Sequence, residues 1–126
     1  MREIIDAWLS NSDISDRIVH VETVPARGAI YEQPDPPLSD RLTEALAARG
    51  IERVYRHQAQ AIRRAGSGIH TVVVAGTASG KSLCYQVPIA EAAMADRKAT
   101  ALLLFPTKAL ARDQFRSLHT LGIPEL

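Results

Sequence analysis

Apolar and polar positions divide the 126-residue chain into an irregular first third and a regular remainder. Beyond Pro37, apolar residues recur at helical spacing in four stretches, and two unbroken apolar runs, 71–74 and 99–105, lie between them. Short unbroken runs bounded by turn residues are typical of strands that are buried on both faces. The order strand, helix, strand predicts a βαβ unit with parallel strands and a right-handed crossover, and therefore an α/β fold.

Each of the four predicted helices has one apolar face that should be turned toward a core. The first begins at an N-cap, Ser39, and stops at Gly50, and the second covers about 57–65. The third contains Pro88, which should kink it or end its first part, and the fourth runs from about Thr107 to residue 121. The residues expected to face inward are Leu42, Ala45, Leu46, Ala61, Ile62, Ala65, Leu83, Val87, Ala90, Met94, Leu110, Phe115 and Leu118.

The first third carries weaker signals. Residues 2–9 place four apolar residues at helical spacing, and residues 18–24 alternate in the manner of a short strand or an extended edge. Four prolines between residues 25 and 37 exclude long regular structure there. We therefore predict two parts, an N-terminal segment, 1–37, and a main domain, 38–126.

Composition places the chain among ordinary globular proteins, since 46% of its residues are hydrophobic and 23% are charged. The formal net charge of +1 gives no global basic field, so any contact with DNA or RNA must be local. The single cysteine, Cys84, excludes an intrachain disulfide, and we expect a packed, unreactive thiol. Without a membrane-length apolar stretch or a signal-peptide core, we expect a cytoplasmic protein that has no membrane partner.

A phosphate-binding loop is the clearest chemical signal. Residues 75–82, Ala-Gly-Thr-Ala-Ser-Gly-Lys-Ser, directly follow the first apolar run, and a strand that enters such a loop is the local pattern of a P-loop. Gly76 and Gly80 let the backbone turn tightly and approach an anion closely. The remaining loop residues have small side chains that leave amide N–H groups free to converge on phosphate oxygens: Ala75, Thr77, Ala78 and Ser79.

Lys81 and Ser82 supply the groups that a nucleoside triphosphate needs. The ammonium of Lys81 can neutralise the β- and γ-phosphates, and the hydroxyl of Ser82 can bind Mg²⁺. The helix that begins here adds unpaired N–H groups and the positive end of its dipole. Ala75 stands where the usual pattern has its first glycine, and a chance Gly-Lys-Ser at a helix start remains the alternative explanation.

A glutamine before the loop is a candidate for reading the base. Gln58 lies on the second predicted helix, and its amide can donate and accept at once, which matches the two edges of adenine. A solvated glutamine on a helix surface is the simpler explanation when the residue is taken alone.

The segment after the second apolar run suits a nucleic-acid backbone. Thr107 should cap the last helix, whose free N–H groups, together with Lys108, can bind phosphates. A solvated helix face explains Lys108 and Arg112 equally well. Since ligands bind beyond the carboxyl ends of parallel strands, this segment and the P-loop should share one edge of the sheet.

Together these blocks resemble the superfamily II helicases of the DEAD/DEAH-box type. Residues 55–58, Tyr-Arg-His-Gln, are similar to the adenine-reading Q motif, 75–82 to motif I, and 106–110 with Asp113 and Gln114 to motif Ia. In the longer stretches around these motifs, the chain resembles the bacterial DNA-repair branch that is related to the mitomycin-repair helicase and to the fungal RecQ4-like helicase. Members of this branch are ATP-dependent 3′-to-5′ DNA translocases.

The resemblance implies a partial RecA-like domain, with ATP and Mg²⁺ as cofactors. The nucleotide would be bound by Gln58 and by the loop from Ala75 to Ser82, with Lys81 and Ser82 as the catalytic residues and Ser82 as the Mg²⁺ ligand. Single-stranded nucleic acid, most simply DNA, would be bound at motif Ia by Pro106, Thr107 and Lys108.

Part of the family's machinery has no counterpart in these residues. Hydrolysis requires an Asp that holds Mg²⁺ and a Glu that orients water, and both follow a third strand in this family. The acids after Lys81 are Glu91, Asp96, Asp113 and Glu125, and none of them follows a strand-like run. We therefore expect an N-terminal piece of a larger motor, inactive alone, whose partner is the missing C-terminal motor domain.

Two alternatives stay open at this stage. The first is a stand-alone module that binds a nucleotide or nucleic acid without turnover. The second is a P-loop kinase of small substrates, although that class gives no reason for Gln58 upstream or for Pro106-Thr-Lys afterwards.

Overall fold

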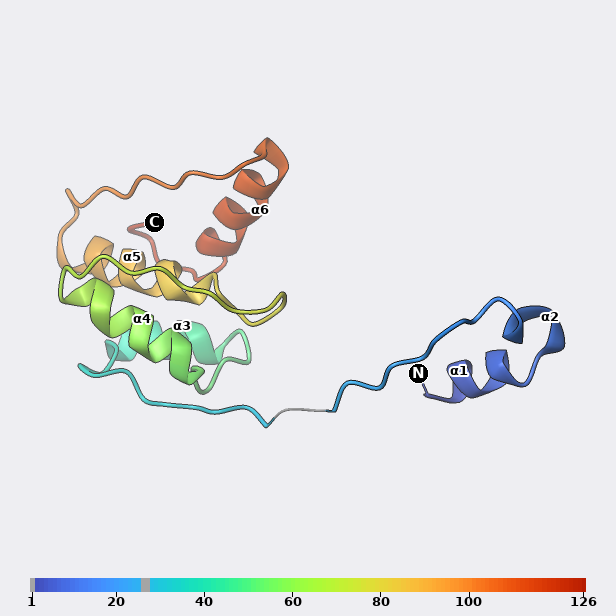
Figure 1. Cartoon of the computed structure of the whole chain (residues 1–126). Coiled ribbons are helices and arrows are strands. Elements are labelled where there is room, and N and C mark those ends of the chain that lie inside the picture. Colours follow the sequence, from blue (N-terminus) through green and yellow to red (C-terminus); the bar gives the residue numbers. More distant parts are fainter. Residues whose placement is uncertain (1, 26–27) are drawn as a thin grey trace.

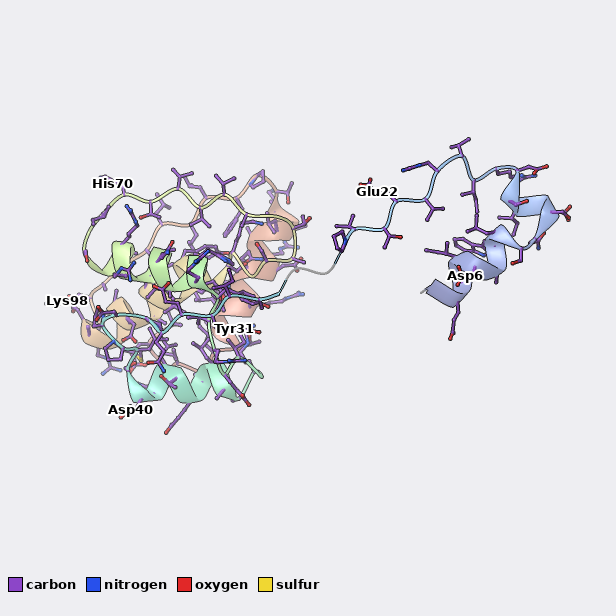
Figure 2. The ribbon with its side chains drawn as sticks, turned by 60° about the horizontal axis from the view of Figure 1, so that its bottom comes forward. Asp6, Glu22, Tyr31, Asp40, His70 and Lys98 are labelled. Atoms are coloured by element: carbon purple, nitrogen blue, oxygen red, sulfur yellow. The ribbon has the colours of Figure 1, made fainter. Side chains whose placement is uncertain are left out.

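The computed structural model describes residues 2–25 and 28–126, so residues 1, 26 and 27 of the predicted segment 1–37 lie outside the description. The helices in the described part are α1 (Arg2–Leu9), α2 (Ser12–Ser15), α3 (Asp40–Ala47), α4 (Arg56–Gly66), α5 (Leu83–Ala95) and α6 (Lys108–His119). Helices α3 to α6 gather into one body, and α1 and α2 stand apart from it (Figure 1). Asp6 and Glu22 lie on the N-terminal arm, whereas Tyr31 and Asp40 lie on the body (Figure 2).

The core of the body is formed by the facing sides of α3, α4, α5 and α6. Helix α4 packs along α5, and α3 also packs against α5. Apolar burial of this kind is the main favourable term in folding. The buried cluster consists of Leu42, Leu46, Ile62, Leu83, Val87, Ala90, Leu118, Leu121 and Ile123. Most residues predicted to face inward are therefore buried, and the helical periodicity was a correct guide to α3, α4 and α5.

Three predictions of inward-facing residues are wrong. Ala65 is exposed near the end of α4, and Leu110 and Phe115 are 39% and 58% exposed on α6. Helix α6 reaches the core through Leu118, near its C-terminal end, so the apolar residues earlier in the helix are left outside. Phe115 contacts the ring of His119 edge-on instead, with the ring centroids 4.3 Å apart.

The predicted parallel sheet is not present in the described part of the chain. The runs 71–74 and 99–105 are extended but form no strands. Within the described residues, β pairing is limited to an isolated antiparallel bridge between Tyr31 and Tyr55. Alternate side chains of the two runs, Val72, Val74, Leu102 and Leu104, are between 82% and 92% exposed. Strands are stabilised by a hydrogen-bonded neighbour on at least one side, and neither run has one here.

The two runs nevertheless have a common direction. In both views they pass over the helices the same way, so the P-loop and the start of α6 lie at the same end of the body (Figures 1 and 2). Residues 18–24, predicted as a short strand or extended edge, form no strand either.

The two ends of α3 differ in how well they match the predicted helix stop and N-cap. Gly50 adopts a positive φ of 75° just after α3, which is the predicted helix stop. The side chain of Ser39 does not cap α3. Its N–H and hydroxyl both donate to Glu91 Oε1, at 2.8 and 3.1 Å, and thereby tie the start of α3 to α5.

Helix α5 continues through Pro88, which therefore does not end it. Asn11 caps the short helix α2, which the sequence analysis missed.

Burial and charge pairing shift two ionisable groups of the body. Burial raises the pKa of the Cys84 thiol, which keeps it protonated and agrees with a packed, unreactive cysteine. Arg41 of α3 donates to Glu125 Oε1 at 3.0 Å, which joins the C-terminal segment to α3 and lowers the pKa of that carboxyl. Among the helices described, none has the length and apolarity needed to cross a lipid bilayer.

Candidate nucleotide and nucleic-acid site

The loop 75–82 connects the first extended run to α5 through a tight turn. Ala78 and Gly80 both have positive φ angles, 58° and 70°. The hydroxyl of Ser79 donates to the carbonyl of Gly76 at 2.7 Å and closes the turn from inside. A turn that alternates right-handed and left-handed residues can direct successive N–H groups into one concavity, which is an arrangement that binds anions.

Lys81 lies inside this loop. Its Nζ donates to the carbonyl of Ala75 at 2.9 Å and also to the carbonyl of Gly76, and it lies 3.4 Å from Ser79 Oγ. The backbone is therefore folded around an ammonium group, so that positive charge is already placed where the loop would receive an anion. Ser82 precedes α5 and makes no capping hydrogen bond with its side chain, so its hydroxyl is not used by the helix.

Gln58 joins the start of α4 to the loop. The residue is 2% exposed, so the structure excludes the solvated glutamine that the sequence left open. Its Oε1 accepts from the N–H of Tyr55 at 2.7 Å, and its Nε2 donates to the carbonyl of Gly80 at 2.8 Å. The amide thus positions two backbone segments, and its role in reading a base stays a prediction.

Gly80 is required by this contact as well as by its φ angle. A Cβ atom at this position would lie 2.5 Å from Gln58 Nε2, which is closer than real Cβ atoms approach other heavy atoms. The two residues therefore form a matched pair: the glycine leaves room for the amide, and the amide fixes the glycine carbonyl.

An aromatic column runs beside Gln58 and reaches the loop. The rings of Tyr31 and Tyr55 stack with centroids 5.2 Å apart, and those of Tyr55 and His57 with centroids 5.7 Å apart. The guanidinium of Arg53 lies 4.1 Å above the Tyr31 ring. His57 Nε2 lies 3.0 Å from the carbonyl of Ser79, which makes this nitrogen the protonated one, since a carbonyl only accepts.

A cavity of about 400 Å³ lies between this column and the loop. Its lining includes Tyr31, Arg53, Tyr55, Gln58, Ala78 and Gly80. Tyr31 and Arg53 were not predicted as site residues. Arg53 lies next to the Q-like segment and was a detectable signal, but Tyr31 reaches the site only through its bridge to Tyr55.

The segment after the second run has the predicted cap. Thr107 Oγ1 accepts from the N–H of Leu110 at 3.2 Å, so α6 begins where the sequence placed it. Pro106, Thr107 and Lys108 are all exposed, and no acid lies in the first turn of the helix. The first turn of α6 therefore combines free N–H groups with a basic side chain.

The cap can be tested directly. Thr107→Ala removes the acceptor for the N–H of Leu110 and should lower the free energy of unfolding by about 1 kcal/mol. Thr107→Ser keeps a hydroxyl at the same place and is the matched control, which should remain close to the wild type. Chemical denaturation followed by circular dichroism measures both variants, and an equal loss in both would contradict the role of the hydroxyl.

Solved structures of one helicase are similar to this chain in overall fold. The DUF1998 helicase MrfA bound to DNA and AMPPNP superposes with a TM-score of 0.80 at 34% identity, over 98% of this chain and 17% of that one. MrfA bound to DNA alone gives a TM-score of 0.73 at 39% identity, over 82% of this chain and 14% of that one. These helicase neighbours imply a RecA-like domain.

Curated relatives give the same family. The ATP-dependent helicase hrq1 of Schizosaccharomyces pombe is 42% identical over 94% of this chain and 11% of its own length. The uncharacterized ATP-dependent helicase YprA of Bacillus subtilis is 37% identical over 83% of this chain and 14% of its own length. The chain thus spans only about a tenth to a seventh of the length of these relatives. Residues 55–126, more than half of the chain, match the DEAD/DEAH box helicase family, and the chain therefore belongs to that family.

Proposed function

We propose that this chain is the ATP-binding, N-terminal part of an ATP-dependent DNA helicase or translocase. The observation that carries the proposal is the loop 75–82 folded around the ammonium of Lys81, with Gln58 fixing its far end. A loop of this kind binds a triphosphate when phosphate oxygens replace the carbonyl groups that the lysine now contacts.

The hydroxyl of Ser82 is the group available to Mg²⁺. Mg²⁺ in nucleotide sites keeps several waters and takes few protein ligands besides the phosphates, so a single hydroxyl at the start of α5 fits this ion. Bound there, the ion would neutralise charge on the phosphates. Lys81 would hold the β- and γ-phosphates, and the N–H groups at the start of α5 would orient them.

The adenine base would occupy the cavity between the aromatic column and the loop. Tyr31 and Arg53 both line the cavity, and the guanidinium of Arg53 lies over the Tyr31 ring. A base would stack on one of these two planar groups. Gln58 lines the same cavity and can accept a further hydrogen bond at Oε1.

The base site predicts a specific loss of ATP affinity. Tyr31→Leu removes the ring and should weaken ATP binding by about tenfold, since stacking on an aromatic ring is worth roughly 1–3 kcal/mol. Tyr31→Phe retains the ring and is the control, with affinity within about twofold of the wild type. Fluorescence titration with a labelled ATP measures both, and equal affinities for the leucine and phenylalanine variants would place the base elsewhere.

Single-stranded DNA would contact the first turn of α6 through Pro106, Thr107 and Lys108. The proposal is supported by the exposed cap and basic side chain, and by the DNA in the MrfA structures. Because the two extended runs point the same way, both ligands would bind at one end of the body.

The finer architecture is part of the proposal. We infer that 71–74 and 99–105 become neighbouring parallel strands when further strands of the same RecA-like domain lie beside them. Residues 1–37 would then form a separate N-terminal segment, and 38–126 the beginning of motor domain 1. The acids that activate water and a second motor domain would come from elsewhere in the parent protein.

A titration separates this function from its alternative. The 126-residue chain should bind labelled ATP with Mg²⁺, and it should not hydrolyse ATP until the rest of the motor is present. Turnover by the full-length protein supports the motor. Binding without turnover in the full-length protein would favour a nucleotide-binding module instead.

A further inference from the structure

A buried glutamine outside the predicted sites joins α5 to α6. Gln86, on the first turn of α5, is 1% exposed. Its Nε2 donates to Ser117 Oγ at 3.2 Å and lies 3.4 Å from Gln114 Oε1, and both partners belong to α6. Tyr85 Oη donates to the same oxygen of Gln114. An amide buried this deeply is costly when it loses its partners, so the contacts hold the two helices in one register.

The end of α3 reaches the same place. Arg49 follows α3, and its guanidinium donates to the carbonyl of Ser117 at 3.3 Å and to Ser117 Oγ at 3.4 Å. Ser117 is thus contacted from two sides, by Gln86 and by Arg49. The apolar contact of α6 with the core is concentrated near Leu118, and apolar contacts have no direction. The orientation of α6 therefore depends on these polar contacts.

The position of Gln86 links this cluster to the phosphate loop. The N–H of Gln86 donates to the carbonyl of Ser82 at 2.9 Å, so one helical turn separates the cluster from the last loop residue. On the other helix, Gln114 lies two turns after the cap residue Thr107. A displacement of the loop on phosphate binding would reach Gln86 through a single rigid turn.

We propose that Gln86 is a positioning residue that couples nucleotide binding at the P-loop to nucleic-acid binding at the start of α6. The inference rests on the proposed function, because it requires both ligands. It assigns to Gln86 no contact with either one. A displacement of the P-loop on nucleotide binding would be transmitted to α6 through the hydrogen bonds of Gln86.

The experiment compares DNA affinity with and without nucleotide in the full-length protein. Fluorescence anisotropy with a labelled single-stranded oligonucleotide gives the dissociation constant, first alone and then with saturating AMPPNP and Mg²⁺. The ratio of the two constants is the coupling factor, expected to be about fivefold or more in the wild type. Gln86→Leu, which keeps the volume and removes the amide, should bring this ratio below about twofold while AMPPNP affinity stays within about twofold.

Matched variants separate coupling from folding. Gln60→Leu changes an exposed glutamine on α4 and should leave the coupling factor unchanged. Tyr85→Phe removes one hydroxyl from the cluster and should reduce the ratio only in part, which keeps the inference testable if Gln86→Leu fails to fold. In a double-mutant cycle, Gln114→Leu combined with Gln86→Leu should lose no more coupling than either change alone.

The outcomes are distinct for the two proposals. A wild-type protein that binds neither AMPPNP nor DNA would overturn the proposed function. A coupling factor equal to the wild-type value in folded Gln86→Leu, or in Tyr85→Phe if Gln86→Leu does not fold, would overturn the positioning role alone. Ligands that bind the wild type independently would overturn it as well.

Discussion

Replacing Lys81 with alanine should reduce ATP hydrolysis by the full-length protein about a hundredfold or more and abolish ATP-dependent unwinding, since the loss of one preorganised group at a developing charge costs about 10²–10³ in rate. The structure gives the reason in terms of position. The ammonium already lies inside the loop, and phosphate oxygens would replace the carbonyl groups of Ala75 and Gly76 as its partners. Steady-state hydrolysis and strand separation of a labelled duplex measure the effect.

The control for Lys81 is another lysine that lies outside the loop. Lys98 is exposed before the second extended run, and in Figure 2 its label lies on the far side of the body from the P-loop. Lys98→Ala should leave hydrolysis within about twofold of the wild type, as expected of a surface charge remote from the site. Unwinding that survives in Lys81→Ala would remove the helicase motor from consideration.

Replacing Gly80 with alanine should give the largest loss of stability expected from a single methyl group in this chain. The positive φ angle of 70° costs an alanine about 1–2 kcal/mol. The new Cβ would also displace Gln58 Nε2 and leave the carbonyl of Gly80 and the buried amide unpaired, at about 1–3 kcal/mol. The free energy of unfolding should therefore fall by about 2–5 kcal/mol, with ATP affinity reduced alongside it.

Gly68 offers a control with the same backbone conformation. Its φ angle is also 70°, but a Cβ atom there would meet nothing within 4 Å. Gly68→Ala should therefore lose only the conformational part, about 1–2 kcal/mol, and keep full ATP affinity. Denaturant titrations of the two variants isolate the contact with Gln58. Equal losses in both would show that the contact contributes nothing to stability.

Local chemistry explains which parts of the site could be predicted from sequence. The loop 75–82 depends on residues that are adjacent in the chain, so its glycines indicate a tight turn and its lysine indicates a positive charge. The cap at Thr107 is local in the same way and was found at the predicted residue. Helices α3 and α4 followed from apolar periodicity, because each buries one face in the core, whereas α5 is apolar on most of its surface.

The cavity beside the loop could not be predicted in the same manner. Tyr31 lies in a proline-rich stretch with no periodic pattern, and it stacks on Tyr55 from 24 positions away in the chain. Gln58 was singled out for its amide, but the sequence held no sign that both of its polar atoms would be used by the backbone of Tyr55 and Gly80. Stacking and burial of this kind depend on which segments meet.

The two extended runs were predicted as buried strands from local sequence, and the structure differs from this prediction. Unbroken apolar character at 71–74 and 99–105 predicted two buried strands, yet alternate residues of both runs are exposed in the described chain. The unbroken apolar pattern is typical of strands in a sheet that is covered on both faces. Pairing itself depends on neighbouring strands, which a short apolar run does not supply.

By itself, the sequence determined the chemistry and the helices: a small-residue loop closed by Lys81 and Ser82, and amphipathic segments that fold by burying one face. Both depend on residues close together in the chain. Only the tertiary structure decided that Gln58 braces the loop at Gly80, that Tyr31 joins the site, and that Gln86 ties α5 to α6. These contacts join residues that are far apart in the chain, and packing alone brings them within hydrogen-bonding or stacking distance.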